Sequence, residues 1–174
     1  GSLEWGRTLD GTGQDYGYDI IQTSDGGYAI TGFTQSYGGS DSDIILIKLS
    51  STGGRQWVRV LNSDYYDNGK AVIQTSDGGY AVAGSYNNNN DIILLKFSSS
   101  GSLQWTKKLD GTGPNYVNSL IQTSDGGYAI TGETQGFGTS SRNLYLLKLN
   151  SAGWGEWMKI LNGTGRGGSL LQTT

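Results

Sequence analysis

Apolar residues along this chain follow two patterns, and both are typical of β-strands. In three segments the apolar residues are consecutive, as in Ile44-Ile45-Leu46-Ile47, which favours a strand buried on both faces. In four other segments every second residue is Trp, a basic residue or Leu, which indicates a strand with one exposed face. The consecutive segments are 43–49, 91–97 and 143–149, and the alternating ones are 3–9, 55–61, 103–109 and 155–161. No segment keeps a 3.6-residue apolar period, and we therefore predict no helix.

The string IQTSDGGYA occurs three times without change, at 21–29, 73–81 and 121–129, and a shorter trace, LQTT, begins at Leu171. The starts of the full copies lie 52 and 48 residues apart, and a period of this size indicates a repeat architecture. Each copy supplies two more strands, an Ile-Gln-Thr strand such as 18–23 and a Tyr-Ala strand such as 28–31. The Ser-Asp-Gly-Gly between them predicts a tight primed hairpin turn with a small bulge.

Each repeat thus contains four strands, and the links between the strands indicate the topology. The link from a Trp strand to the next Ile-Gln-Thr strand is the longest regular one, whereas the others are hairpin-like, apart from a variable loop after the second strand. A long crossover from the outer strand of one four-stranded unit to the inner strand of the next is what a β-propeller requires. The expected order within a blade, from inside to outside, is Ile-Gln-Thr, Tyr-Ala, aliphatic, Trp.

The motifs of the repeat are Trp-x-Lys-x-Leu, Gly-Thr-Gly, Ile-Gln-Thr-x-Asp-Gly-Gly-Tyr-x-x-x-Gly and Asp-Ile-x-Leu-x-Lys. Their combination resembles the bacterial and archaeal β-propeller repeat family of secreted and surface proteins, and the resemblance covers nearly the whole chain. It implies a propeller fold. It also implies an extracellular or cell-surface protein that serves in binding, adhesion or structural display.

The fold class that we predict is all-β, with propeller blades of four antiparallel strands in a single repeat domain over 1–174. It comprises three complete blades and one extra strand at each end: outer strand 3–9, blades 18–61, 70–109 and 118–161, and inner strand 168–173. Propellers usually need at least four blades to close. We therefore expect an incomplete ring, which is part of a longer propeller, is completed in a homo-oligomer through the terminal strands, or stays open with capped ends.

Composition excludes several classes of function. The chain has no Cys and no His, so disulfides, thiol chemistry and Ser-His or Cys-His nucleophiles are ruled out, and zinc binding is disfavoured. The net charge is −3 and the 12 basic residues are scattered, which argues against a nucleic-acid interface. No apolar run is long enough to insert into a membrane. We expect no enzymatic activity, no cofactor and no metal.

The crossover segments carry the candidate binding residues. Tyr beside Asp and Asn suits a polyhydroxylated ligand, because an aromatic ring stacks on a sugar face while planar polar groups bond its hydroxyls. The alternative is that the Tyr side chains pack between blades and the Asp and Asn side chains form turns. The candidates are Asp15, Tyr16, Tyr18, Tyr65, Tyr66, Asp67, Asn115, Tyr116 and Asn118.

Other repeated residues are expected to be structural. The Asp-Gly-Thr-Gly segments at 10–13 and 110–113 offer oxygen ligands for calcium, but a turn is the favoured interpretation. Lys48, Lys96 and Lys148 recur within the aliphatic strands, and three equivalent copies favour a structural role over catalysis. In that role the amine either snorkels to solvent or pairs with a carboxylate. The repeated Trp residues are expected to pack in the core or between blades.

The leading functional hypothesis is a non-enzymatic binding or structural propeller module with a glycan or protein ligand, either self-associating or part of a longer propeller. One alternative is a lectin-like glycan-binding module. Another is a hydrolase with paired carboxylates, such as Asp15 with Asp19 or Asp64 with Asp67. A further alternative is a self-assembling element whose open ends join head to tail.

Overall fold

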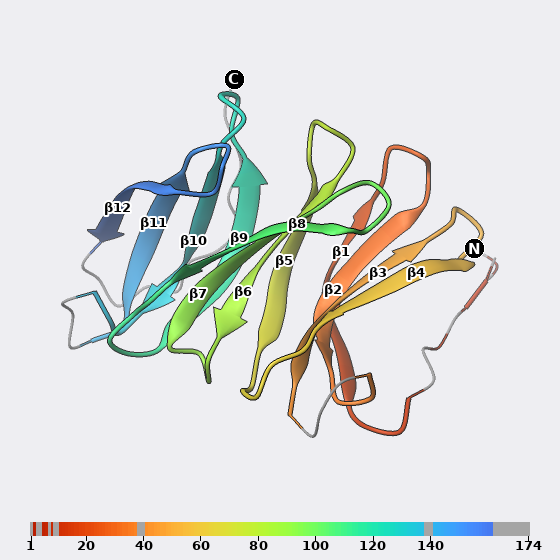
Figure 1. Cartoon of the computed structure of the whole chain (residues 1–174), viewed down its shortest axis with the longest axis horizontal. Coiled ribbons are helices and arrows are strands. Elements are labelled where there is room, and N and C mark those ends of the chain that lie inside the picture. The colour runs from red at the N-terminus through yellow and green to blue at the C-terminus, as the bar shows by residue number, and fades with distance from the viewer. Residues whose placement is uncertain are drawn as a thin grey trace.

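The structure is a computed structural model that describes residues 2, 5, 6, 8, 11–37, 41–137 and 141–161. Within these ranges the chain forms twelve strands, no helix, and three separate antiparallel sheets of four strands (Figure 1). The predicted all-β fold class is confirmed. The extra strands expected at 3–9 and 168–173 lie partly and wholly outside the described residues.

Each sheet consists of four consecutive strands in chain order, and we call the sheets blades A, B and C. Blade A contains β1 (Asp15–Gln22), β2 (Tyr28–Thr34), β3 (Asp43–Leu49) and β4 (Arg55–Leu61). Blade B contains β5 (Asn68–Gln74), β6 (Tyr80–Tyr86), β7 (Asp91–Phe97) and β8 (Leu103–Leu109). Blade C contains β9 (Asn115–Gln122), β10 (Tyr128–Thr134), β11 (Asn143–Leu149) and β12 (Gly155–Leu161). The predicted order of strands within a blade is therefore confirmed.

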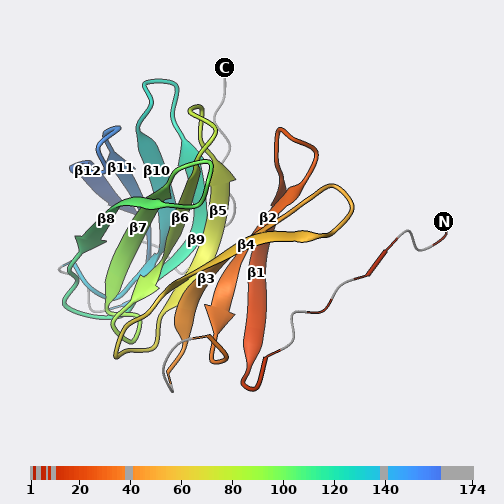
Figure 2. The same cartoon turned by 45° about the vertical axis from the view of Figure 1, so that its right-hand side comes forward.

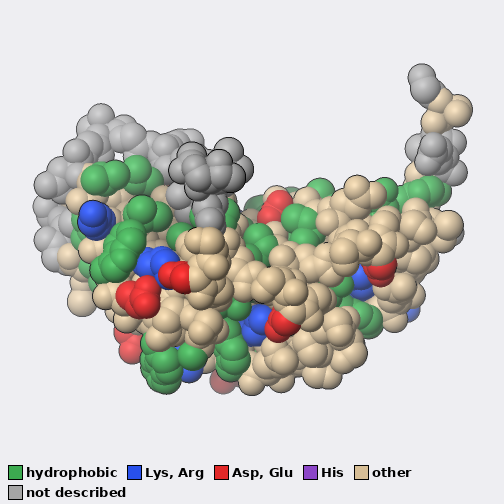
Figure 3. Space-filling view, turned by 90° about the horizontal axis from the view of Figure 1, so that it is seen from above, with side chains coloured by type: hydrophobic (Ala, Val, Ile, Leu, Met, Phe, Trp, Pro, Cys, Tyr) green, Lys and Arg blue, Asp and Glu red, His purple; other side chains and the backbone are tan. Residues whose placement is uncertain are grey.

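The blades stack in chain order, with blade B between the other two (Figure 2). The inner strand β5 packs against β1, β2 and β3, and β9 packs against β5, β6 and β7 in the same way. Seen from above, the stack curves as an arc and does not close into a ring (Figure 3). Blades A and C therefore each have one face without a described neighbouring blade.

The apolar core lies between successive blades. Ile44 and Leu46 of β3 point toward blade B and pack in one cluster with Ile93 and Leu95 of β7. The next interface repeats this pattern, with Ile92 and Leu94 of β7 in a cluster with Tyr145 and Leu147 of β11. Since alternate residues of β7 face opposite neighbours, all of its residues are buried, as its continuous apolar sequence predicts.

The β1–β2 hairpin turn differs from the prediction. A primed two-residue turn needs positive φ at both central residues for type I′, or at the first for type II′. Here Gly26 alone within the turn has positive φ, at 77°, and its N–H donates to the carbonyl of Thr23 at 2.8 Å. The turn is therefore a four-residue reversal that ends in a left-handed glycine, and the same geometry recurs at Gly78 and Gly126.

The repeated lysine binds this turn. Lys48 Nζ lies 2.9 Å from Asp25 Oδ2 and donates to the carbonyl of Leu49 at 2.9 Å. An added Cβ at Gly27 would lie 2.3 Å from the carbonyl oxygen of Leu49 and 2.5 Å from the same Nζ, so the second glycine of the motif makes room for the β3 backbone and for the ammonium group bound to it. The equivalent pairs are Lys96 with Asp77 and Lys148 with Asp125, and acidic and basic side chains meet at three places in Figure 3. Of the two structural roles expected for these lysines, the structure shows pairing with a carboxylate.

The single aspartate of this motif is held ionised by its partners. Burial alone would raise the pKa of Asp77, but hydrogen bonds from Thr75, Lys96 and the Gly79 N–H outweigh burial and lower the pKa to about 2. Hydrogen bonds from Thr23, Lys48 and Gly27 likewise lower the pKa of Asp25. The turn therefore has a buried lysine paired with an ionised, solvent-facing carboxylate in each blade.

A bulge in each inner strand explains the last glycine of the motif. The register of β1 against β2 passes from Gly17 opposite Gly32 to Asp19 opposite Thr31, so Tyr18 is the extra residue. An added Cβ at Gly32 would lie 1.7 Å from the backbone carbonyl oxygen of Tyr16, which no side chain can tolerate. Lys70 and Asn118 occupy the bulge in the other two blades.

Candidate functional site

One polar candidate in each blade, at or just before the start of the inner strand, is bound by the protein itself; Asp67 lies directly before β5. The carboxylate of Asp15 accepts hydrogen bonds from Thr34 at 2.5 Å and from Ser36 at 2.7 Å. The carboxylate of Asp67 accepts from Ser63 at 2.6 Å and from the N–H of Asn87 at 2.9 Å. These side chains hold their strands to loops about 20 residues away in the chain.

Asn115 holds the equivalent position in blade C. Its amide group donates to the carbonyls of Asn90 and of Gly113, the latter at 2.7 Å, and its side-chain oxygen accepts from Thr134 at 2.6 Å. Asn115 is fully buried. It therefore joins blades B and C rather than facing solvent.

Asp67 is the most perturbed carboxylate of this set. Burial raises the pKa of Asp67 above its ordinary value, and the nearby carboxylate of Asp43 raises it further. Hydrogen bonds from Ser63 and Asn87 oppose this effect without reversing it. Because Asp67 is fully buried, its raised pKa reflects a structural position rather than an acid presented to substrate.

Six candidates lie in the inner strands, and four of them lie upstream of the strand starts expected at residues 18 and 118. The bulge allows the inner strand to continue upstream of the repeated motif, so β1 starts at Asp15 and β9 at Asn115. The six are Asp15, Tyr16, Tyr18, Asn115, Tyr116 and Asn118. Tyr65 and Tyr66 remain in the link between β4 and β5, where both side chains are exposed.

One aromatic surface contains two of the candidates. Tyr16 stacks on Phe33 with ring centroids 5.0 Å apart, and Tyr18 lies 5.9 Å from the same ring. The ammonium group of Lys70 lies 3.3 Å from the centroid of the Tyr18 ring. Sequence reasoning missed Phe33 and Lys70, although Lys70 shares the bulge position with Tyr18 and Asn118 and could have been aligned with them.

The remaining aromatic candidates lie in two other places. Tyr65 makes an edge contact with Tyr86 at 6.3 Å. Tyr116 lies beneath the guanidinium group of Arg142 at 5.0 Å, and Arg142 in turn lies 3.5 Å from Glu133. The structure therefore divides the candidates among separate clusters, one on each blade.

The repeated Trp forms the contact between blades. Trp57 of β4 packs edge-on against Tyr80 of blade B at 5.5 Å, and Trp105 of β8 packs against Tyr128 of blade C at 5.9 Å. Trp5 makes the equivalent contact with Tyr28 of blade A, at 5.7 Å. The predicted packing between blades is confirmed for Trp57 and Trp105. Trp5 packs on blade A but belongs to no described blade, and Trp157 is exposed rather than packed.

Each of these Trp rings also covers a glycine in the turn between the third and fourth strands of the next blade. An added Cβ would lie 3.0 Å from Trp57 at Gly101 and 2.7 Å from Trp105 at Gly153. It would lie 2.6 Å from Trp5 at Gly53. We call this seat, formed by the turn glycine and the neighbouring Tyr, the Trp groove. Blades A, B and C each have one, and Trp5 occupies that of blade A.

Polar contacts fix the same interface. The N–H of Ser24 in blade A donates to Gln74 Oε1 in blade B at 2.8 Å, and Ser76 donates to Gln122 in the same way at 2.8 Å. Arg59 Nε donates to the carbonyl of Gly101 at 2.7 Å. The interface between successive blades is therefore a repeated unit with both apolar and polar parts.

The outward face of blade C presents this unit with no described partner. Trp157 is 45% exposed and Leu161 is 54% exposed, whereas the equivalent Trp and Leu of the other blades pack on the next blade. Apolar side chains are visible at the blade C end in Figure 3. Within the described residues, the side of blade C that carries this Trp is therefore not covered by another blade. We call this side of a blade the donor face.

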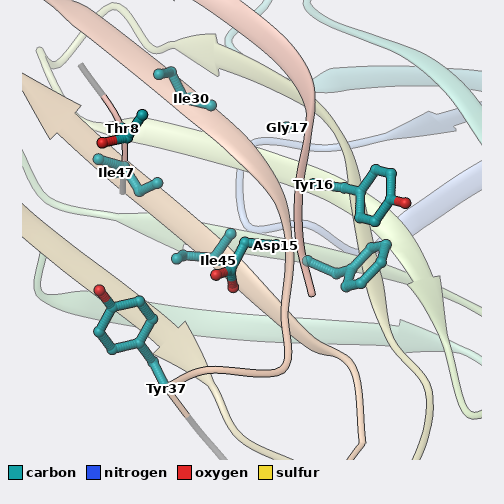
Figure 4. A pocket seen from close by; sticks show the side chains of 9 residues that line it. Thr8, Asp15, Tyr16, Gly17, Ile30, Tyr37, Ile45 and Ile47 are labelled. Carbon is teal, nitrogen blue, oxygen red and sulfur yellow. The ribbon is translucent and has the colours of Figure 1, made fainter. Parts of the chain in front are cut away.

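The opposite face of blade A carries a Trp groove and the positions that a preceding blade covers in blades B and C. We call this side of a blade the acceptor face. Ile20 is 59% exposed, whereas Val72 at the equivalent position of blade B is 1% exposed, because blade A covers it. A cavity of about 290 Å³ opens on this face. It is lined by Thr8, Asp15, Tyr16, Gly17, Ile30, Phe33, Tyr37, Ile45 and Ile47, with the isoleucines of β2 and β3 at its base (Figure 4).

The carboxylate pairs do not converge on this cavity. Asp15 lies on its wall, bonded to Thr34 and Ser36, whereas Asp19 accepts a hydrogen bond from the N–H of Val72 at 2.8 Å. Among the residues that the structure describes, no group of three or more acidic side chains is arranged to hold a metal ion. The chemistry available at the cavity is apolar contact with a polar rim.

Searches among models of known protein families and among curated proteins return no match for this chain.

Proposed function

We propose that this chain is a non-enzymatic β-propeller module that associates through its blade faces with further blades of the same kind. One observation carries the proposal. The contact of a Trp with the groove of the next blade occurs at every blade junction, and Trp157 at the end of the array presents the same side chain without a described partner.

Burial of this face supplies a driving force for association. Transfer of apolar surface out of water contributes roughly 25 cal/mol for each Å². Trp157 and Leu161 are exposed, and the facing Leu144 and Leu146 are only partly buried, so this side carries four apolar side chains with Lys159 between Trp157 and Leu161. Such a surface on an end sheet marks an interaction site.

The resemblance of the repeat to propeller proteins of bacterial and archaeal surfaces supports a location outside the cell or at its surface. In that setting the module serves structural display, either within a longer propeller or in an assembly of copies. The repeated Lys–Asp turns and glycine-dependent bulges are consistent with this role, because they stabilise each blade in the same way.

Sedimentation velocity across a range of protein concentrations tests the proposal. The wild-type chain is expected to associate, and Trp157→Ala is expected to shift the association to much higher concentration. Tyr65→Ala is the matched control, because Tyr65 is also 45% exposed but lies on the rim between β4 and β5. A chain that stays monomeric at all concentrations, or equal effects of the two variants, would contradict the proposal.

The aromatic surface of blade A favours glycan binding as a second candidate function. Tyr16, Tyr18 and Phe33 present adjacent rings beside the ammonium group of Lys70, and aromatic faces stack on sugar rings. A glycan array should then show binding that Tyr16→Ala and Tyr18→Ala abolish and Tyr65→Ala preserves. An array without signal would exclude this candidate.

A further inference from the structure

We propose that the partner is a second copy of this chain, whose blade C seats on blade A with Trp157 taking the place that Trp5 holds. This inference rests on the proposed function. It specifies the partner, the two faces that dock, and Trp5 as the side chain that competes with Trp157 for the groove. Trp5 and Trp157 have the same chemical group and the same position in the repeat, and blade A offers one Trp groove at Gly53 and Tyr28. Two indole rings cannot occupy one groove, so Trp5 must leave when the second copy docks.

The apolar surfaces match because the chain already uses them twice. At the A–B junction, Ile44 and Leu46 cover Ile93 and Leu95. At the B–C junction, Ile92 and Leu94 cover Tyr145 and Leu147. The blade C face carries Leu144 and Leu146 at the covering positions, and the blade A face carries Ile45 and Ile47 at the covered positions. Ile45 and Ile47 are already buried, with Trp5 and Thr8 on the same side of blade A, so the second copy must displace this N-terminal segment.

This correspondence gives the cavity on blade A an occupant. The cavity of about 290 Å³ is lined by Ile30, Ile45 and Ile47, and these are the positions that a preceding blade covers in blades B and C. Leu144 and Leu146 of a second copy are the side chains that reach this place when the junction is repeated. The cavity is thus the unfilled part of a blade junction rather than a site for a small molecule.

The polar part of the junction is also available. Ser24 and Ser76 each donate a backbone N–H to a Gln of the next blade. The equivalent donor on blade C is Ser124, and the equivalent acceptor on blade A is Gln22, and both residues are exposed. Lys159 stands where Arg59 donates to turn carbonyls of the next blade, so the cation needed at the junction is present.

Two copies that dock in this way form a closed assembly. Each copy has one donor face and one acceptor face, so a pair of copies uses all four faces in two identical junctions. The pair contains six blades, twice the three that the structure describes, and propellers close with about four to eight blades. A head-to-tail contact closes into a ring when the rotation fits and otherwise gives filaments.

Sedimentation of two variants tests this inference. Trp157→Ala removes the side chain that docks, and is expected to weaken association at least about 100-fold, the usual effect of removing a packed Trp. Trp5→Ala removes the competitor, and is expected to strengthen association about tenfold, because the groove is then free in a larger fraction of molecules. The same substitution thus has opposite effects at the two positions.

Mixing two variants distinguishes a loss of docking from a loss of folding, because two unfolded variants could not restore association. Ile20→Glu places a charge at the acceptor face on an exposed side chain, so the isolated chain should still fold. Neither Ile20→Glu nor Trp157→Ala should associate alone. Together they should form a one-junction pair, because blade C of the first chain and blade A of the second are both intact.

The outcomes separate this inference from the proposed function. If Trp5→Ala weakens association, the N-terminal segment bridges the copies and the inference fails, while association through blade ends stands. If Trp157→Ala leaves association unchanged, both fail. If the mixture of Ile20→Glu and Trp157→Ala stays monomeric, the head-to-tail polarity is wrong.

Discussion

Replacing a Trp by Ala measures how much a blade junction contributes to the free energy of unfolding. The same replacement can be made where the next blade is present and where no described blade follows. Trp105 packs on Tyr128 of blade C and covers Gly153, whereas Trp157 is 45% exposed. We predict that Trp105→Ala destabilises the monomer far more than Trp157→Ala does.

The magnitude follows from the contacts that each side chain makes. Replacing a packed Trp by Ala costs about 3–5 kcal/mol, and an edge-to-face aromatic contact contributes about 0.5–1.5 kcal/mol of that. Trp105 is only partly buried, so we expect a loss of about 3 kcal/mol, at the low end. Trp157 lacks the partner blade, and we expect a loss of about 1 kcal/mol or less, close to that of a surface substitution.

The assay is urea unfolding followed by far-ultraviolet circular dichroism, at a protein concentration below association. Repeat proteins unfold by units, so the slope of each transition must be compared as well as its midpoint. Losses of equal size for the two variants would refute the argument, because they would show that the junction contributes nothing beyond packing within one blade.

Three further predictions concern the repeated motif and the core. Gly32→Ala should destabilise the chain by about 1–3 kcal/mol in urea unfolding, because its added Cβ would overlap a β1 carbonyl. The control is the facing Gly17→Ala, which should cost less than about 1 kcal/mol because the nearest contact of its added Cβ is 3.5 Å. The pKa of Asp77 is about 2 in the folded protein and about 3.9 in the unfolded chain, so the ionised form stabilises the fold. This contribution to stability is complete above about pH 4 and is lost as the pH falls toward 2. Asp77→Asn should therefore flatten the acid limb of a stability–pH curve measured by thermal melting, and an unchanged limb would contradict the assigned role. Tyr145→Phe should leave stability unchanged or raise it by up to about 1 kcal/mol in urea unfolding, because the buried hydroxyl has no hydrogen-bond partner within the described structure; a large loss would show a partner.

The sequence predicts the blade well because its signals are local and periodic. In β7 every residue faces one of two neighbouring blades, so a continuous apolar run is the direct record of burial on both faces. In β8, an edge strand, alternation of Trp105, Lys107 and Leu109 records a face that packs and a face that meets solvent. The continuous pattern occurs three times and the alternating one four times in the sequence, so each strand type is assigned from several copies.

The parts that the sequence does not predict depend on backbone geometry and on contacts across blades. The inner strand starts at Asp15 rather than at Tyr18, because a bulge at Tyr18 keeps the ladder intact, and a bulge has no hydrophobic signature. The turn at Asp25-Gly26 is a four-residue reversal because Asp25 is bonded to Thr23 and Lys48, and Lys48 lies 23 residues away in the chain. Such partners appear only once the sheet is assembled.

Cross-linking between copies tests most directly the claim that blade C of one chain docks on blade A of another. Because the sequence contains no Cys, only the introduced cysteines can react. Cysteines at Ser24 and Gln74 should link within one chain and calibrate the reach of a short bis-maleimide, because these residues bond at the A–B junction. A chain that carries Ser124→Cys and Gln22→Cys should then give a covalent product of two chains. Cross-linked chains of increasing length, or links between Ser124→Cys chains alone, would contradict a closed pair built from repeated blade junctions.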